Sequence, residues 1–379
     1  MSWLGALAVL IVTALGAWLL SQALGRLAHM RAMEASLEGF SYLLSGDPDR
    51  AIAVLTKVAA TGNLEAYFAL GSLFRRKGEL ERAIQLHRNI LKAPALSPPQ
   101  RLRALTELGR DFRQAQLWVE AIEVLRQAVA QPGSELELRA AWEELRDGLL
   151  AAGELQAAAE IQDRVAGGKT NALGAHLWAE AAMAALAAGD TASALAAAGR
   201  SERADPDSIH GQFAQIAALS VQRDIVETRQ SAIDLAERSP QTAEVVLAWL
   251  VQLESRAGTL PQLEAALDER ARRGLLAPQT ALLRAQIARD RLDTEAAVTQ
   301  LQELLVRRPD FLPARQTLNE ILLNTGRLAA MPEQVRALLS ALDVAAPPRC
   351  QRCQSPMREP SWRCPACGAF DFESPLKGG

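Results

Sequence analysis

The chain of 379 residues contains only four cysteines, and none of them precedes residue 350. A secreted domain held together by disulfides needs an oxidising compartment, and such a domain carries many cysteines for its length. The long cysteine-free part therefore argues against that class of protein. Two disulfides among the four C-terminal cysteines are the alternative that this observation disfavours without removing it.

Aromatic residues make up only 4% of the chain, and no alternation of strand and helix patterns is visible, whereas Ala and Leu are abundant. That composition favours helices. The sequence contains no H-E-x-x-H, no G-x-S-x-G and no P-loop motif. The chain has four histidines, each isolated in the sequence, and these are His29, His87, His176 and His210. We expect no enzyme here, with neither catalytic residues nor a site for an organic cofactor.

The net charge is −3, and basic and acidic residues are mixed along the chain. A nucleic-acid-binding protein usually concentrates basic residues in a patch or a stripe. The tail from Arg349 onwards carries only a slight basic excess, so a zinc ribbon that reads nucleic acid has little support. We expect no nucleic-acid partner.

Residues 1–25 contain no charged side chain. As a helix, the apolar run over residues 3–24 is long enough to cross about 30 Å of hydrocarbon. Arg26 and Arg31 follow the run closely, and such arginines hold their side of a span in the cytoplasm. The alternative is a secretory signal peptide with a poor cleavage site at Ser21-Gln22-Ala23, but no basic segment precedes the run. We expect one transmembrane helix over residues 1–25, with the bulk of the chain facing the cytoplasm.

The middle of the chain repeats a turn signal that is followed, five residues later, by an alanine or another small residue. Clear copies start at Gly46, Gly78, Gln116, Gly153 and Gly189, and fainter copies start at Arg223, Gly258, Arg291 and Gly326. The mean step of about 35 residues is close to the period of tetratricopeptide repeats. In such a unit the turn glycine ends helix A, and the small residue lets helix B pack closely against it.

One helix pair cannot bury its apolar face alone, so neighbouring pairs must stack. Leu70-Gly71 with Phe74, and Leu108-Gly109 with Phe112, match the helix A pattern of the repeat. We therefore expect an all-α fold, a tetratricopeptide-repeat superhelix of about nine helix pairs over residues 26–345. A generic alanine-rich helical bundle is the alternative, and the regular step argues against it.

Superhelices of this kind expose a concave groove, lined mainly by helix A, that binds peptides and proteins. Several basic residues lie near the ends of two expected A helices, and these are Arg75, Arg76, Lys77, Arg101, Arg103, Arg110 and Arg113. They form either a basic rim for a client or, as is more usual for surface charges, a solvated face. We expect protein partners, and the sequence leaves association into homo-oligomers open.

All four cysteines lie in two C-x2-C pairs about ten residues apart, which is the spacing of a four-thiolate metal site. The expected ligands are Cys350, Cys353, Cys364 and Cys367, in a small domain over residues 346–379. Gly368 suits the positive φ at which such a turn ends. The other readings are free thiols without a common role and a redox C-x-x-C, which normally opens a helix in a βαβ unit.

The site would hold one metal ion, zinc or iron, because both metals accept four thiolates. With every ligand position filled by sulfur, the ion has no open position for substrate and is structural. A redox-active iron is the exception and would make the chain a membrane-tethered electron carrier. Trp362, Phe370 and Phe372 are expected to form the small apolar core of this domain. Thiolates persist best in a reducing compartment, which agrees with a cytoplasmic location.

The order of anchor, repeats and cysteine pairs resembles the lipopolysaccharide assembly protein B family of Gram-negative bacteria along the whole chain. The most specific segments are residues 42–45 (YLLS), 70–75 (LGSLFR), 79–87 (ELERAIQLH), 108–112 (LGRDF) and 362–367 (WRCPAC). The resemblance implies a rubredoxin-like C-terminal domain that binds a metal through the four cysteines. It also implies a single-pass adaptor of the inner membrane that regulates lipopolysaccharide synthesis.

In that family the adaptor promotes degradation of the deacetylase LpxC by the membrane protease FtsH. It also contacts an inner-membrane partner that reports the supply of lipopolysaccharide. The partners expected from the resemblance are therefore an FtsH-type protease, an LpxC-type client and an inner-membrane regulator. A generic repeat scaffold for envelope assembly is a further alternative.

Overall fold

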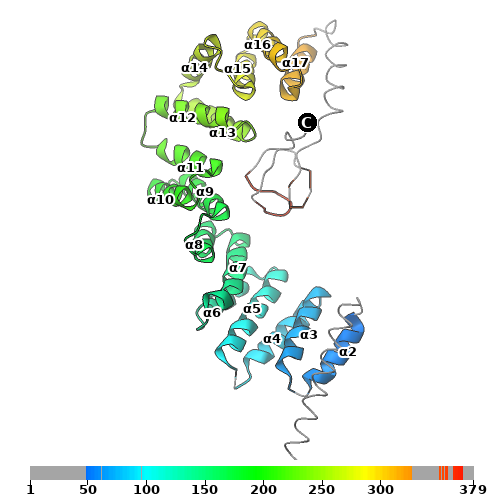
Figure 1. Ribbon diagram of the computed structural model, residues 1–379. Helices are drawn as coiled ribbons and strands as arrows, with labels where there is room; N and C mark the ends of the chain where they lie inside the picture. Colours follow the sequence, from blue (N-terminus) through cyan, green and yellow to red (C-terminus); the bar gives the residue numbers. More distant parts are fainter. Residues whose placement is uncertain are drawn as a thin grey trace, which may run out of the picture. The chain divides into compact units, whose positions relative to one another are not determined.

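The computed structural model describes residues 48–60, 62–94, 96–326, 350, 352–353, 355–356 and 362–369, and Figure 1 shows their arrangement. These residues form sixteen helices, α2 to α17, and no strand. The expected transmembrane helix over residues 1–25 lies outside the described residues. Within the described ranges, no helix combines the length and the apolar character that a membrane crossing requires. The all-α fold class is confirmed for this part of the chain.

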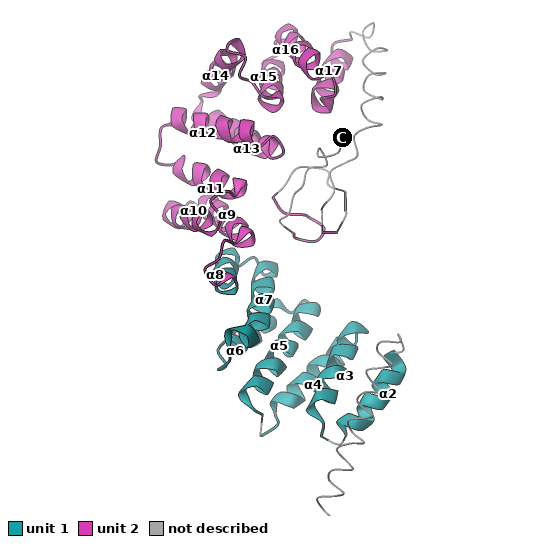
Figure 2. Ribbon diagram, viewed as in Figure 1, with its two compact units in different colours: residues 1–165 teal, residues 166–379 magenta. Residues whose placement is uncertain are grey.

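The chain divides into two compact units, residues 1–165 and 166–379 (Figure 2). The helices of unit 1 pack as successive antiparallel hairpins, α3 with α4 and α5 with α6, and α2 packs against α3. Helix α8 follows α7 and shares a core cluster with it. Their bounds are α2 Pro48–Ala59, α3 Leu64–Arg76, α4 Leu80–Leu91, α5 Pro98–Gln114, α6 Trp118–Val129, α7 Glu135–Ala151 and α8 Leu155–Ala166.

Unit 2 continues the same pattern in α9 with α10, α11 with α12, α13 with α14 and α15 with α16, and α17 packs against α16. The bounds are α9 Ala172–Ala187, α10 Thr191–Ala204, α11 Ile209–Leu219, α12 Ile225–Arg238, α13 Ala243–Ala257, α14 Leu260–Arg272, α15 Pro278–Asp290, α16 Thr294–Arg307 and α17 Leu312–Asn324.

The turn between the two helices of a hairpin follows the expected chemistry. Gly78 has φ +80°, a left-handed conformation that costs glycine nothing, and Ala83, five residues later, is fully buried. Gln116 and Leu292 occupy the equivalent turns with φ 60° and 64° although neither is a glycine. The geometry of the repeat is therefore kept even where its most recognisable residue has been replaced.

Close contact within the hairpins of unit 1 depends on two glycines of helix A. A Cβ atom at Gly109 would lie 2.4 Å from Leu125 Cγ, and one at Gly71 would lie 2.4 Å from His87 Nε2. In both cases the contacted residue follows the glycine by sixteen residues. His87 therefore occupies the core position of helix B that a leucine fills in the next repeat.

The hydrophobic core consists of local clusters, each shared by neighbouring hairpins. In unit 1, α2, α3 and α4 contribute to one such cluster and α6, α7 and α8 contribute to another. The largest cluster of unit 2 combines α11, α12, α13, α14 and α15. This serial packing is typical of a repeat array, whereas a generic bundle surrounds one common core.

Candidate metal centre and the repeat surface around it

The Sγ atoms of the four cysteines lie within 4.8 Å of one another. Those of Cys350 and Cys367 are 3.6 Å apart, and those of Cys353 and Cys364 are 3.8 Å apart. A zinc ion with four sulfurs at about 2.3 Å places neighbouring sulfurs about 3.8 Å apart in a tetrahedron. A disulfide would need about 2.05 Å. The four cysteines therefore fit one tetrahedral metal ion and are not paired as disulfides.

Backbone hydrogen bonds close each cysteine pair into a tight loop. The N–H of Cys350 donates to the carbonyl of Ser355 at 3.1 Å, and the N–H of Cys364 donates to the carbonyl of Ala369 at 2.7 Å. Gly368 has φ +71°, as its place after the second pair predicts. Cys350 and Cys364 are buried, and Cys353 and Cys367 are exposed. We call the described residues from 350 to 369 the knuckle.

The local hydrogen bonds act differently on the thiols. Hydrogen bonds from the hydroxyl and the N–H of Ser355 lower the pKa of Cys353 to about 6. The N–H of Cys367 is the main cause that lowers the pKa of Cys364. At Cys367 the N–H of Ala369 favours the thiolate, but burial and the neighbouring sulfurs outweigh it and raise the pKa to about 12. A sulfur must be deprotonated to ligate a metal, so the site is already biased towards thiolates at two positions.

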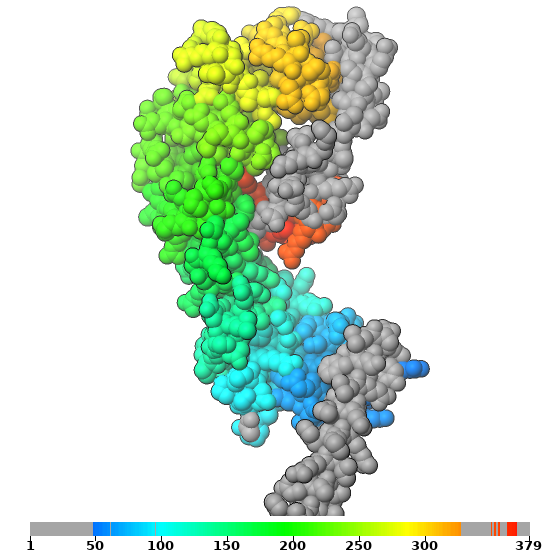
Figure 3. Space-filling view, viewed as in Figure 1, coloured from blue at the N-terminus to red at the C-terminus, as the bar shows by residue number. Residues whose placement is uncertain are grey.

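Trp362 connects the knuckle to the repeats of unit 2. Its ring stacks on His210 of α11 with centroids 4.3 Å apart and planes 1° apart. It also lies 6.0 Å from the ring of Phe213 and packs against the largest core cluster of unit 2. In the space-filling view the described knuckle residues, in orange and red, lie beside the green helices of this unit (Figure 3).

This contact corrects one expectation. Trp362 does not form a hydrophobic core within the knuckle. The described cluster of the knuckle consists of Cys350, Cys364 and Ala369. The cluster around Phe213 offers the indole ring a larger apolar surface than the three-residue cluster of the knuckle. Phe370 and Phe372 lie outside the described residues.

A histidine pair lies under the tryptophan. Nδ1 of His176 on α9 is 3.1 Å from Nδ1 of His210, which is only 1% exposed. The Nε2 atom of His210 makes no hydrogen bond, and the nearest carboxylate oxygen, from Glu180, is 3.7 Å away, too far to hold a proton. Along the sequence both histidines are isolated. Their separation of about one repeat period places them on adjacent A helices, and that spacing was the available signal.

We expect the packing around His210 to weaken in acid. Burial, followed by the charge of His176, lowers its pKa from 6.5 to about 3. The unfolded chain therefore binds more protons than the folded chain between these values, and stability falls as the pH drops through 6.5. At pH 5 the loss is about 2 kcal/mol. Amide hydrogen exchange of α11 measured between pH 7.5 and 5, and corrected for the intrinsic rate, should report it.

A His210→Phe variant keeps a ring against Trp362 and is the matched control. Burial raises the pKa of Glu180, so this carboxyl makes the protein more stable, not less, as the pH falls. The protonation of Cys353 also changes in this pH range. The wild-type protein and the variant share both contributions, so the difference between their pH dependences reports the contribution of His210. The same pH dependence in both would contradict the assignment.

The arginines proposed as a basic rim are largely neutralised in unit 1. Arg75 of α3 donates to Asp111 at 2.7 Å and to Glu107 at 2.6 Å, both on α5. Arg110 contacts Glu107 at 2.6 Å and Glu144 of α7 at 2.7 Å. This chain of ion pairs, which we call the α3–α5–α7 ladder, extends to Arg113. It connects successive A helices, and because its arginines are paired and largely buried, these residues match neither a free basic rim nor a fully solvated face.

His87 completes the buried end of the ladder. Its Nδ1 atom lies 2.5 Å from the second carboxylate oxygen of Asp111, and both side chains are fully buried. A histidine next to an aspartate is a familiar catalytic arrangement, but this pair has no exposed atom through which a substrate could be reached. We therefore assign it to the packing of α3, α4 and α5.

Comparisons with known proteins agree with this architecture. The family model described as "Tetratricopeptide repeat" matches residues 66–102. The lipopolysaccharide assembly protein B of Escherichia coli (strain K12) is 27% identical over 361 residues, which cover 90% of this chain and 88% of that protein. The Haemophilus influenzae protein of the same name is 31% identical over 84 residues, covering 20% of this chain and 21% of the relative.

Among solved structures, the TPR2AB-domain:pHSP90-complex of yeast Sti1 is 14% identical, with a TM-score of 0.31. The match covers 83% of this chain and 99% of the Sti1 chain. The repeats and the four-cysteine knuckle define a tetratricopeptide-repeat protein with a candidate metal site at its C-terminal end. The resemblance to the lipopolysaccharide assembly protein B family is confirmed along nine-tenths of the chain.

Proposed function

We propose that this chain acts in lipopolysaccharide assembly as an adaptor that binds proteins and performs no chemistry of its own. The single observation that carries the proposal is the similarity to lipopolysaccharide assembly protein B over 90% of the chain. Stacked helical hairpins support it, because repeat arrays of this class present extended surfaces for protein partners. The cysteine geometry, which leaves a metal no open position, also favours a structural role over a catalytic one.

The finer proposal is an inner-membrane adaptor that promotes FtsH-dependent degradation of the LpxC deacetylase. A helix over residues 1–25 would confine the repeats, with a bound client, to the membrane that holds the protease. Such confinement raises the effective concentration of client at the protease without any new contact between them. An inner-membrane regulator of the adaptor and a cytoplasmic location for the repeats belong to the same proposal.

Depletion of the protein tests this mechanism. We expect the half-life of LpxC to lengthen and its level to rise severalfold, and we expect a copy without residues 1–25 to restore degradation poorly. Unchanged LpxC turnover after depletion would reject the FtsH mechanism. If lipopolysaccharide assembly still failed under that condition, the protein would be a repeat scaffold for envelope assembly instead.

A membrane-tethered electron carrier is the second candidate, because Cys353 and Cys367 are exposed. Surface-accessible sulfurs would give an electron-transfer partner a route to a rubredoxin-type iron. Metal analysis of the purified chain separates the two functions. Zinc as the bound metal would leave no redox chemistry, whereas iron with reversible visible absorbance changes on reduction would favour the carrier.

A further inference from the structure

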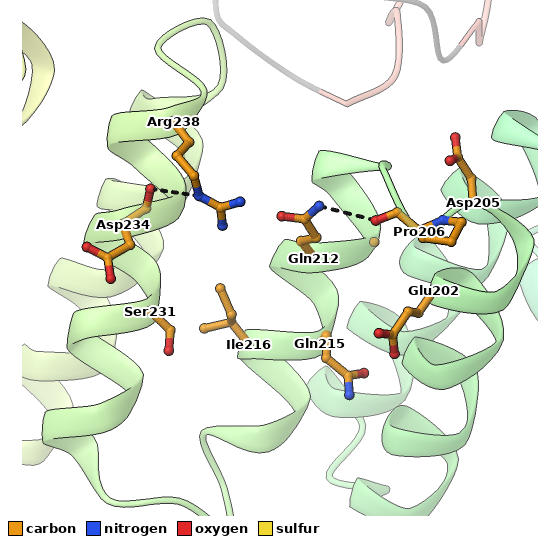
Figure 4. Close-up of a pocket in the computed structure, with 10 residues that line it drawn as sticks. Glu202, Asp205, Pro206, Gln212, Gln215, Ile216, Ser231, Asp234 and Arg238 are labelled. Atoms are coloured by element: carbon orange, nitrogen blue, oxygen red, sulfur yellow. Dashed lines mark hydrogen bonds between the residues drawn. The ribbon is translucent and has the colours of Figure 1, made fainter.

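A cavity of about 340 Å³ lies between α10, α11 and α12 in unit 2 (Figure 4). Its volume is at the lower end of the range for ligand pockets, about 300–1,000 Å³. Glu202 of α10 and Gln215 of α11 lie on one side, and Ser231 and Arg238 of α12 lie on the other. Its lining comes from two successive B helices, α10 and α12, and from the A helix α11 between them in the chain.

The side formed by α11 and the C-terminal end of α10 combines two carboxylates, those of Glu202 and Asp205, with the side-chain amide of Gln215. Glu202 is exposed and forms no ion pair with any residue that the structure describes, and the buried Oε1 atom of Gln215 accepts no hydrogen bond. Helix α10 ends at Ala204, and the C-terminal end of a helix carries a partial negative charge. Of the other two carboxylates that line the cavity, Asp205 accepts from the N–H of Asp207 at 3.1 Å, and Asp234 is paired with Arg270 at 2.5 Å. This side of the cavity therefore attracts a positively charged group.

The opposite side carries a donor. The Nε atom of Arg238 donates to the backbone carbonyl of Asp234 at 3.4 Å, and the remaining guanidinium nitrogens make no hydrogen bond within the described residues. Ile216 supplies an apolar surface between the two sides (Figure 4). Because the two sides differ in charge, the cavity is matched to a ligand with a cation at one end and a hydrogen-bond acceptor at the other.

We propose that this cavity binds the side chain of a lysine or an arginine from an extended segment of a partner protein. The cationic head lies against Glu202 and Gln215, and its aliphatic stem covers Ile216, as long basic side chains do on apolar surfaces. A backbone carbonyl of the same segment accepts from Arg238. The assignment goes beyond the role in lipopolysaccharide assembly and does not depend on it, since binding can be measured with the purified chain alone.

A second cavity of about 270 Å³ shows that this charge arrangement is not a general property of the repeats. It occupies the equivalent place between α14, α15 and α16, and its lining includes Arg284, Arg307 and Arg308. Only one carboxylate, that of Glu303, lines it. Arg284 is paired with Asp268 and Arg308 with Asp310, and the charges of Arg307 and Glu303 balance, so a basic side chain would find no excess of negative charge there.

The test uses the full-length chain in lipid nanodiscs and two peptides, acetyl-Ala-Arg-Ala-amide and its citrulline counterpart. Citrulline keeps the shape of arginine and removes the charge. In ligand-observed NMR titrations we expect the arginine peptide to bind with a dissociation constant of about 1 mM and the citrulline peptide about tenfold more weakly. Glu202→Gln should weaken the arginine peptide to the level of the citrulline peptide. Glu244→Gln, an exposed carboxylate on α13, is the matched control and should change nothing.

A charge reversal separates recognition from a damaged fold. Glu202→Lys should bind acetyl-Ala-Glu-Ala-amide better than the arginine peptide, with an unchanged thermal unfolding curve because the side chain is exposed. The proposal is overturned if the arginine peptide shows no saturable binding, if the citrulline peptide binds equally well, or if Glu202→Gln has no effect. Altered LpxC turnover with normal peptide binding would bear on the proposed function and not on this cavity.

Discussion

Replacing Cys364 by serine is expected to remove the bound metal and to release the knuckle from unit 2. Structural zinc supplies about 10–16 kcal/mol of apparent binding free energy in small zinc-finger peptides, and that energy is also their folding energy. Trp362, two residues before Cys364, then loses the loop that presents it to His210 and Phe213. Metal analysis should fall from one ion per chain to a small fraction of that value.

The release of Trp362 is expected to be visible in α11. Removing a large aromatic from a packed site costs about 3–5 kcal/mol, so amide exchange in α11 should accelerate by about two to four orders of magnitude. Trp362→Ala should give the same acceleration, with the four sulfurs still present. Ala366→Ser introduces a serine into the same loop without touching a sulfur, and it should retain both the metal and the protection. A Cys364→Ser protein with full metal content would refute the assignment of the site.

Asp111→Ala is expected to destabilise unit 1 by about 3–5 kcal/mol. The variant removes the carboxylate that Arg75 and His87 share, so it leaves the buried imidazole without a partner and Arg75 with Glu107 as its remaining carboxylate. Urea-dependent hydrogen exchange of the helices α3 to α6 measures the loss separately from the stability of unit 2. Asp111→Asn preserves the volume and one acceptor oxygen, so its cost should be smaller.

An exposed ion pair of the same unit provides the control. Arg126→Ala breaks the contact with Glu154, whose side chain is about half exposed, and the loss should stay below about 1 kcal/mol. Equal effects of Asp111→Ala and Arg126→Ala would show that the α3–α5–α7 ladder is solvated in solution. In that case the basic-rim interpretation of Arg75 and Arg110 would return.

The sequence predicted those features that one local pattern encodes. Gly78 makes the turn and Ala83, five residues later, allows the close contact of the two helices. This spacing therefore predicts a hairpin without reference to the neighbouring repeats. The two cysteine pairs work in the same way, because the metal geometry is contained in the spacing. At Gln116 the pattern was recognised despite the missing glycine, because the neighbouring positions still matched.

The features that the sequence did not predict depend on residues far apart in the chain. Nothing in the segment LGRDF shows that Asp111 is buried between an arginine and a histidine from two other helices. The placement of Trp362 against α11 required knowledge that an apolar cluster was available there. The residues that line the cavity next to Glu202 come from three helices, and only their assembly distinguishes them from ordinary surface residues.

The contact between Trp362 and α11 has a consequence for biosynthesis. About 150 residues separate Phe213 from Trp362, and a bacterial ribosome needs roughly ten to thirty seconds to add them. Throughout that time His210 and Phe213 of α11 are exposed in the nascent polypeptide, because Trp362 is not yet there to pack on them. A transcript cut short before the last cysteine pair would leave these residues exposed permanently, so the cell's chaperones and proteases have a means of distinguishing finished molecules from incomplete ones.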